Sequence, residues 1–151
     1  MKSLQRGLVI NVNLDPTLGS ETGKTRPCVI VTNDVYNQRV PVIQVVPITE
    51  WSDKKGQIIT NVVIEPNSTN GLSKKSVADC LQTRPIDHRH RLTKIRGKLD
   101  DGTMQRIDQA LKMTRSLTSQ IDFPTFRPIS SGSKYQSHFL LQFSRAGEIS
   151  R

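Results

Sequence analysis

The feature that most constrains the fold is a series of short apolar runs, rich in β-branched residues and separated by turn-forming residues. The runs occupy residues 10–14, 28–32, 42–48, 58–64 and 76–81. Val, Ile and Thr favour extended backbone, and runs of this length bounded by Pro, Gly and Asn are typical of strands. Short strands at this density, joined by loops, predict a small closed or half-open barrel.

One later segment, residues 100–117, departs from the strand pattern and predicts a helix. Its apolar residues fall on one helical face: Met104, Ile107, Leu111 and Leu117. Asp100 and Asp101 stand where negative charge stabilises the start of a helix, and basic residues stand near its end. Residues 33–37 predict a turn or a short helix. The predicted fold class is therefore mainly β with a C-terminal helix (α+β).

The charge balance favours an acidic partner. Lys and Arg number 22 against 13 acidic residues, which gives a formal net charge of +9. Nucleic acid is the first expectation, an acidic protein segment the second and a membrane surface the third. No apolar run approaches the roughly 18 residues that a membrane span needs, and the start of the chain is too polar for a secretory signal. Cys28 and Cys80 are then expected to be buried, reduced thiols of a cytoplasmic protein.

Composition changes near residue 120, where the aromatic residues begin to gather. All four Phe residues and one of the two Tyr residues follow that point, together with many serines. We therefore predict a main domain over residues 1–118 and a C-terminal extension over residues 119–151. For the extension, disorder, packing on the main domain and partner binding all stay open.

Arg26 stands at the entrance of a buried-strand pattern, in the stretch TRPCVIVTND. Because Arg26 precedes Pro27, its backbone is restricted to extended conformations. A guanidinium held at the end of a rigid strand can clamp a phosphate through two charge-assisted hydrogen bonds. It can also form an ordinary surface salt bridge, and this stretch taken alone favours the salt bridge.

Two other segments suggest chemistry on first inspection. The glycine-rich, basic residues 19–26 are not a phosphate-binding P-loop, because Gly19 and Gly23 are one position too close and a strand follows. In residues 87–91 (DHRHR), the neighbouring positive charges disfavour a metal site. The two histidines there could act as acid and base in metal-free RNA cleavage, but a solvated basic face is favoured.

A larger set of residues recurs in a fixed order along the chain. It comprises Arg6-Gly7, Asp15-Pro16-Thr17, Gly19-Ser20-Glu21, Thr25-Arg26-Pro27, Asn33-Asp34, Pro47-Ile48-Thr49, Ser76-Val77, Gln82-Thr83-Arg84, Ile86-Asp87 and Arg91-Leu92. In this order and spacing, residues 5–118 resemble the MazF/PemK family of type II toxin–antitoxin toxins. The chain departs from the family pattern at Pro85 and by one inserted residue between Asp87 and Arg91.

The resemblance implies a small Src-homology-3-like barrel of the MazF/PemK/CcdB type that forms a homodimer. It implies a sequence-specific endoribonuclease that cuts single-stranded mRNA without a metal or other cofactor, and an acidic antitoxin as partner. The family's catalytic arginine and threonine match Arg26 and Thr49. The positions expected to bind RNA are Ser20, Lys24, Asn33, Gln82 and Arg84.

Metal-free RNA cleavage would use the ribose 2′-OH as nucleophile and leave 2′,3′-cyclic phosphate and 5′-OH ends. Arg26 would stabilise the charge that develops on the phosphate, and Thr49 would donate a hydrogen bond to it. Glu21 is the candidate general base, or else it orients Arg26. Two alternatives stay open: a non-catalytic RNA-binding barrel and a toxin of the same fold that poisons DNA gyrase.

Overall fold

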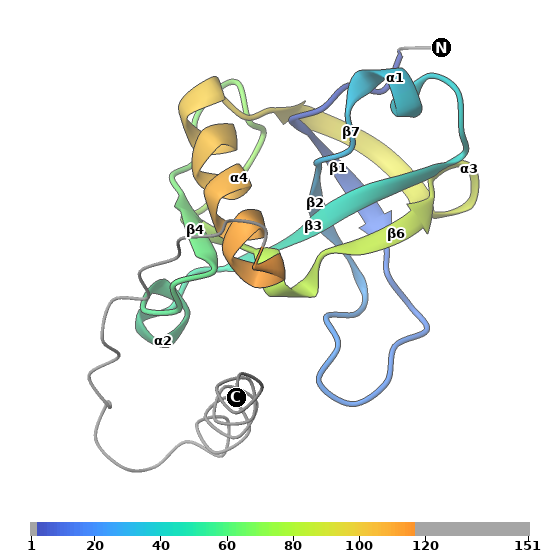
Figure 1. Cartoon of the computed structure of the whole chain (residues 1–151). Helices are drawn as coiled ribbons and strands as arrows, with labels where there is room; N and C mark the ends of the chain where they lie inside the picture. The colour runs from blue at the N-terminus through green and yellow to red at the C-terminus, as the bar shows by residue number, and fades with distance from the viewer. Residues whose placement is uncertain (1–2, 117–151) are drawn as a thin grey trace, which may run out of the picture. The chain divides into compact units, whose positions relative to one another are not determined.

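The computed structural model describes residues 3–116 (Figure 1). The predicted extension over residues 119–151 and the last residue of the predicted helix lie outside this part. The elements in chain order are β1 (Leu8–Asn13), β2 (Thr25–Ile30), α1 (Asp34–Asn37), β3 (Val42–Glu50), α2 (Asp53–Gly56), β4 (Asn61–Ile64), β5 (Ser76–Asp79), the 3₁₀-helix η1 (Cys80–Gln82), β6 (Arg84–Asp87), α3 (His88–Arg91), β7 (Leu92–Lys98) and α4 (Asp101–Arg115).

The strands form one antiparallel, seven-stranded sheet in the order β4-β5-β3-β2-β1-β7, with β6 paired to β3 beside this path. Strand β3 connects the two parts of the sheet. Its residues 42–47 pair with β2 and β6, and its last three residues pair with β5. Mostly antiparallel strands with a helix at the C-terminal end confirm the predicted fold class.

The central strands are buried on both faces, as predicted for the run that starts at Cys28. Cys28 and Ile30 belong to one hydrophobic cluster, while Val29 between them belongs to the other. The same alternation holds at Val9 and Ile10 in β1. Because neighbouring residues of a strand point to opposite faces, β1, β2 and β3 separate two small cores.

Helix α4 covers one of these cores with the apolar face that was predicted for residues 100–117. Met104, Ile107 and Ala110 are buried on its inner face, and the helix lies against β4 and η1 (Figure 1). The Asp100 carboxylate caps its first turn by accepting a hydrogen bond of 2.8 Å from the Thr103 amide. Within residues 3–116, no helix is both long and apolar enough to span a membrane.

Several boundaries differ from the predicted ones. Strand β2 begins at Thr25, so Arg26 and Pro27 lie inside it and pair with β1. The ladder to β3 starts only at Cys28, and Pro27 therefore costs no hydrogen bond on that side. Strands β4 and β5 are shorter than predicted, because residues 58–60 turn and residues 80–82 form η1. Strands β6 and β7 and the short helices α2 and α3 were not predicted.

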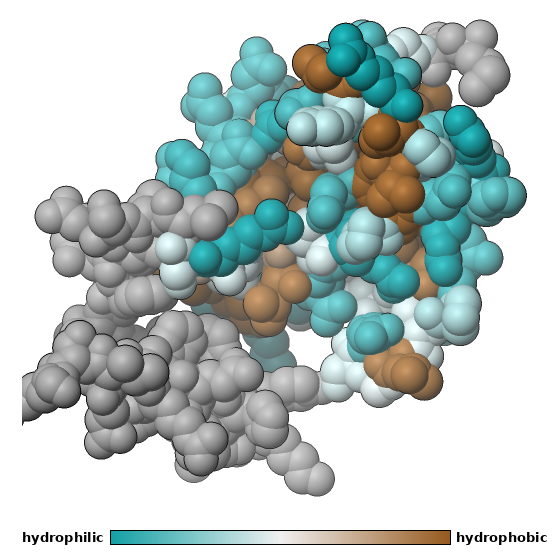
Figure 2. Space-filling model, turned by 45° about the vertical axis from the view of Figure 1, so that its right-hand side comes forward, coloured by the Kyte–Doolittle hydropathy of each residue, from teal (hydrophilic) through white to brown (hydrophobic). Residues whose placement is uncertain are grey.

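On the face shown in Figure 2, hydrophobic residues lie in several groups between hydrophilic ones. One such group lies on α1 and at the approach to and start of β3: Val35, Tyr36, Val40 and Val42. Asn33 caps α1 by accepting a hydrogen bond from the Tyr36 amide, so the segment predicted as a turn or a short helix at residues 33–37 is a short helix over Asp34–Asn37.

Candidate active site

Arg26 is half-buried and follows directly on the loop between β1 and β2. Its Nε donates a hydrogen bond of 2.7 Å to the carbonyl oxygen of Gly23. Within residues 3–116, Arg26 forms no ion pair, and its two terminal guanidinium nitrogens make no hydrogen bond. A surface salt bridge therefore does not explain Arg26. The guanidinium is anchored through one nitrogen, while the other two are left for an anion.

Thr49 would face Arg26 if the ladder between β2 and β3 continued two residues beyond its last pair. Cys28 pairs with Pro47 at the end of the ladder between β2 and β3. Two residues further along the two strands are Arg26 and Thr49, and an even step along a strand keeps the side chain on the same face. The predicted catalytic residues therefore stand where β2 and β3 separate, since Thr49 itself pairs with Val77 of β5.

Arg84 is the third residue of this neighbourhood. It enters from β6, opposite Val45 of β3, and donates a hydrogen bond of 3.3 Å to the carbonyl oxygen of Leu14. Burial raises the pKa of the Cys28 thiol to about 12, although the nearby Arg26 and Arg84 guanidinium groups act in the opposite direction. Cys28 is thus a neutral core residue between two arginines, and not a nucleophile.

The loop between β1 and β2 is held in shape by hydrogen bonds from the segment around β6. Gln82 binds it twice: its Oε1 accepts from the Thr22 amide at 3.2 Å, and its Nε2 donates to the Ser20 carbonyl at 3.3 Å. A terminal nitrogen of Arg91 donates to the Asp15 carbonyl at 2.8 Å. The side chains of Gln82 and Arg84, predicted to bind RNA, are thus bound to this loop.

Close packing inside the loop requires a glycine at position 23. A Cβ there would lie 2.5 Å from the hydroxyl oxygen of Thr17 and 2.7 Å from a carboxylate oxygen of Asp15. The same Asp15 oxygen accepts a hydrogen bond of 2.9 Å from the Lys24 amide. Since the Gly23 carbonyl holds Arg26, this packing fixes the position of the guanidinium as well.

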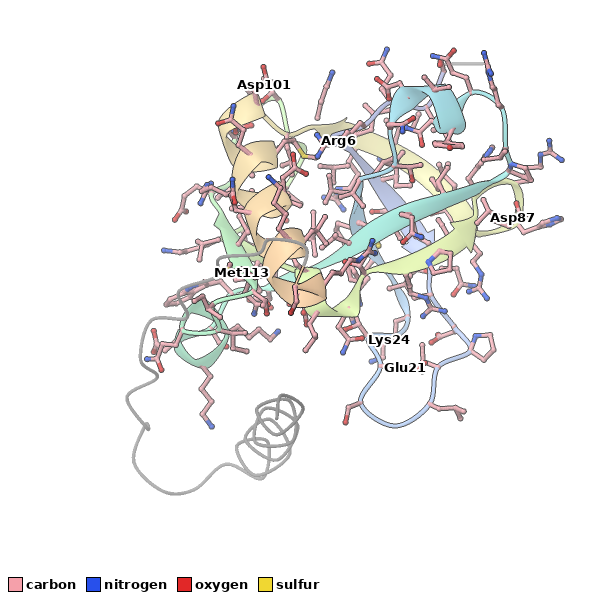
Figure 3. All side chains as sticks on the ribbon, viewed as in Figure 1. Arg6, Glu21, Lys24, Asp87, Asp101 and Met113 are labelled. Carbon is pink, nitrogen blue, oxygen red and sulfur yellow. The ribbon has the colours of Figure 1, made fainter. Side chains whose placement is uncertain are left out.

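The remaining predicted residues of the loop are exposed. Ser20, Glu21 and Lys24 lie on it, and Figure 3 shows Glu21 and Lys24 on the side of the sheet opposite to Arg6 and Asp101. One carboxylate oxygen of Glu21 accepts a hydrogen bond of 3.2 Å from the Leu18 amide, and the other oxygen accepts no hydrogen bond from residues 3–116. The exposed side chain of Lys24 adds positive charge at the rim.

Asn33 lies at a different end of strand β2 from Arg26 and the loop. Strand β2 runs from Thr25 to Ile30, so Asn33 follows its far end, where it caps α1 (Figure 1). The structure therefore brings together Arg26, Thr49 and the loop, and leaves this predicted RNA-binding residue at the opposite end of the strand.

Sequence reasoning did not single out Lys55, which contacts Thr49. The Lys55 ammonium donates hydrogen bonds of 3.1 Å each to the Thr49 hydroxyl oxygen and the Glu50 carbonyl oxygen. The signal that could have revealed it is the Ser52-Asp53 pair, a helix start that turns the following lysines back over β3.

Asp79 lies near this lysine, and its carboxyl group has a raised pKa. Burial raises the pKa of the Asp79 carboxyl, and the Gln82 and Leu81 amides and the Lys55 ammonium only partly oppose this effect. No cluster of three or more His, Cys, Asp or Glu side chains in the described part of the chain is arranged to hold a metal ion.

The described residues form a small antiparallel β protein with an anchored arginine at a strand entrance, and such a guanidinium can bind a phosphate group. The sequence over residues 5–114 matches the family of PemK-like, MazF-like toxins of type II toxin–antitoxin systems. The match covers most of the chain, and the protein belongs to this family.

Individual relatives agree with this assignment. The chain is 36% identical over 120 residues to the Endoribonuclease EndoA of Bacillus subtilis, which covers 80% of this chain and 98% of the relative. Its fold is similar to that of MazF from Deinococcus radiodurans, with a TM-score of 0.66 at 19% identity over 77% of this chain and 99% of the other. A mycobacterial endoribonuclease in complex with its cognate antitoxin has a TM-score of 0.62 at 21% identity, over 78% and 99%.

Proposed function

We propose that this toxin is a metal-independent endoribonuclease that cuts single-stranded RNA at short sequences. The observation that carries the proposal is the Arg26 guanidinium, which is anchored through Nε and forms no ion pair within the described residues, at the strand end where the ladder between β2 and β3 stops. Membership of the toxin family and the relation to an enzyme named as an endoribonuclease support it.

In the proposed reaction, the ribose 2′-oxygen attacks the adjacent phosphorus atom. The bond between phosphorus and the 5′-oxygen breaks and the departing 5′-oxygen takes a proton from water, which leaves a 2′,3′-cyclic phosphate and a 5′-OH. Negative charge gathers on the non-bridging phosphate oxygens, and the two terminal nitrogens of Arg26 are placed to donate hydrogen bonds to them. The Thr49 hydroxyl adds a further donor.

The proton of the 2′-OH needs an acceptor, and Glu21 is our candidate. One of its carboxylate oxygens is bound to the Leu18 amide, so the second is available. Arg26 is unsuited to this role, because a guanidinium stays protonated at any ordinary pH. Glu21 would then remove the proton, or hold Arg26 for the phosphate.

The RNA path would follow the loop between β1 and β2. Lys24 and Ser20 are exposed there, and Arg84 reaches the start of the loop at the Leu14 carbonyl. Single-stranded RNA is the substrate expected, because its bases can be turned outward against a protein surface. Asn33 stands apart from this path, and its predicted part in binding would require RNA that extends to the α1 end of the sheet.

We further propose a homodimer and an acidic antitoxin, in the cytoplasm. The exposed apolar group on α1 and at the approach to and start of β3, which contains Val35, Tyr36, Val40 and Val42, offers a surface for a second copy. The net charge of +9 suits an acidic antitoxin segment that covers the RNA path.

The test is incubation of the full chain with a long single-stranded RNA in EDTA, followed by mapping of the cut ends. Arg26→Ala is the variant and Arg39→Ala the control, since Arg39 is exposed, carries the same charge and lies beyond α1. Discrete cuts with cyclic phosphate ends, lost only in Arg26→Ala, are expected. If folded wild-type protein leaves the RNA intact, the proposed cleavage activity is wrong. The two alternatives would then be a non-catalytic RNA-binding protein and a toxin that poisons DNA gyrase.

A further inference from the structure

Lys55 donates a hydrogen bond to the hydroxyl group of Thr49. Its ammonium lies 3.1 Å from the Thr49 hydroxyl oxygen, and its second hydrogen bond, to the Glu50 carbonyl, ties it to the strand end that carries Thr49. The Glu50 carboxylate does not compete for Lys55, because it pairs with Lys74 at 2.8 Å.

The backbone of Lys55 is fixed as well. Its amide donates to the Ser52 side chain that caps α2, and its carbonyl accepts a hydrogen bond of 3.0 Å from the Asn61 side chain. The turn that follows packs on Trp51, since a Cβ at Gly56 would lie 2.8 Å from the indole nitrogen. These contacts fix the backbone position from which the Lys55 side chain reaches Thr49.

We propose that Lys55 is a positioning residue for RNA cleavage and acts through Thr49; this inference rests on the function proposed above. A hydroxyl group has one donor and two acceptor positions. When the Lys55 ammonium occupies one acceptor position, the hydroxyl proton of Thr49 points elsewhere, and the side that faces Arg26 is where the phosphate would lie. The hydroxyl is then set as a donor before RNA arrives.

Lys55 also strengthens this donor. A hydroxyl that accepts a hydrogen bond from a cation becomes more polarised, and its own O–H donates more strongly. The gain counts most in the transition state, where the phosphate oxygens carry more charge than in bound RNA. Loss of Lys55 should therefore lower the rate of the chemical step more than it lowers affinity for RNA.

The experiment is a double-mutant cycle on single-turnover cleavage, with protein in excess over RNA. It compares Lys55→Met, Thr49→Val and the double variant with the wild-type chain. Lys54→Met is the matched control: Lys54 is the adjacent residue of α2, is exposed, and its removal changes the net charge equally. Binding is measured separately, by RNA titration in the Arg26→Ala background, where cleavage is blocked.

Lys55→Met is expected to slow cleavage about tenfold to a hundredfold, the range for one hydrogen bond from a charged donor. Lys54→Met should leave the rate within about twofold, and both lysine variants should weaken RNA binding equally. In the Thr49→Val background, Lys55→Met should have no further effect on the rate, because the group through which Lys55 acts is gone.

Two outcomes would overturn the inference while the proposed function stands. Equal rates for Lys55→Met and Lys54→Met would show that the lysine contributes only charge. Full additivity with Thr49→Val would show that Lys55 contacts RNA independently. Failure of the proposed function is seen differently, as absence of cleavage by the wild-type chain.

Discussion

Gln82 offers a test of whether a side chain reads RNA or shapes the loop that meets it. The resemblance to the toxin family predicts that Gln82 binds RNA. In the structure, both ends of its amide are bound to the loop between β1 and β2, at 3.2 Å to the Thr22 amide and 3.3 Å to the Ser20 carbonyl. We therefore predict that Gln82→Met impairs cleavage by releasing the loop.

The size of the effect follows from these two contacts. Each neutral hydrogen bond contributes about 0.5–1.5 kcal/mol, and the volume of Met is close to that of Gln. The loop should thus lose about 1–3 kcal/mol of its local stability, or roughly a five- to 150-fold gain in its open population. The core keeps its packing, so the midpoint of global unfolding should move little.

The assay combines amide hydrogen exchange with cleavage of a randomised RNA pool. In Gln82→Met, the Thr22 amide should exchange faster, and cleavage of all preferred sequences should slow by a similar factor. Leu81→Ala is the control, because Leu81 is the exposed neighbour of Gln82 in η1. Unchanged exchange at Thr22, together with a changed preference at a single base, would refute the loop argument and make Gln82 a base-reading residue.

Two further predictions concern stability. Burial raises the pKa of Asp79, so its charged carboxylate lowers the stability of the fold as the pH rises above the usual value of 3.8. Asp79→Asn should therefore be more stable than wild type at pH 7, and the difference should vanish in acid. Equal free energies of unfolding for the two proteins at both pH values would contradict this. Ile107 is fully buried on the inner face of α4, so Ile107→Ala should lower the free energy of unfolding by about 2–5 kcal/mol in a urea titration. The exposed Gln109→Ala should change it by less than about 0.5 kcal/mol, and a similar small loss for Ile107→Ala would count against the packing of α4.

The sequence predicted the elements whose signal is local. The helix over residues 100–117 has an apolar face, acidic residues at its start and basic residues at its end, and α4 follows closely. Strand β7 was missed because its signal is not local. Leu92–Lys98 carries three basic residues and a glycine and shows no clean alternation, and it becomes a strand because β1 offers it an edge.

The same distinction applies to the site. Pro27 alone was enough to predict that Arg26 stands at a strand entrance. The match to the family motif indicated Thr49 as the second catalytic residue. The contacts of Gln82 and Lys55 could not be foreseen, because they depend on how separate elements meet. Gln82 lies 60 positions from Thr22 along the chain, and no periodicity links the two residues.

These observations also explain why an arginine stands at the start of a buried strand. Strand β2 needs a partner on each side, but between Thr25 and Pro27 it pairs only with β1, because β3 turns away to β5. Beyond this point Arg26 keeps only its pairing with Val12 of β1, and Thr49 pairs with Val77 of β5. A proline tolerates this free edge, and the loop carbonyl of Gly23 turns the arginine into it. The geometry that ends the ladder therefore leaves the Arg26 guanidinium at the place where we propose that the phosphate binds.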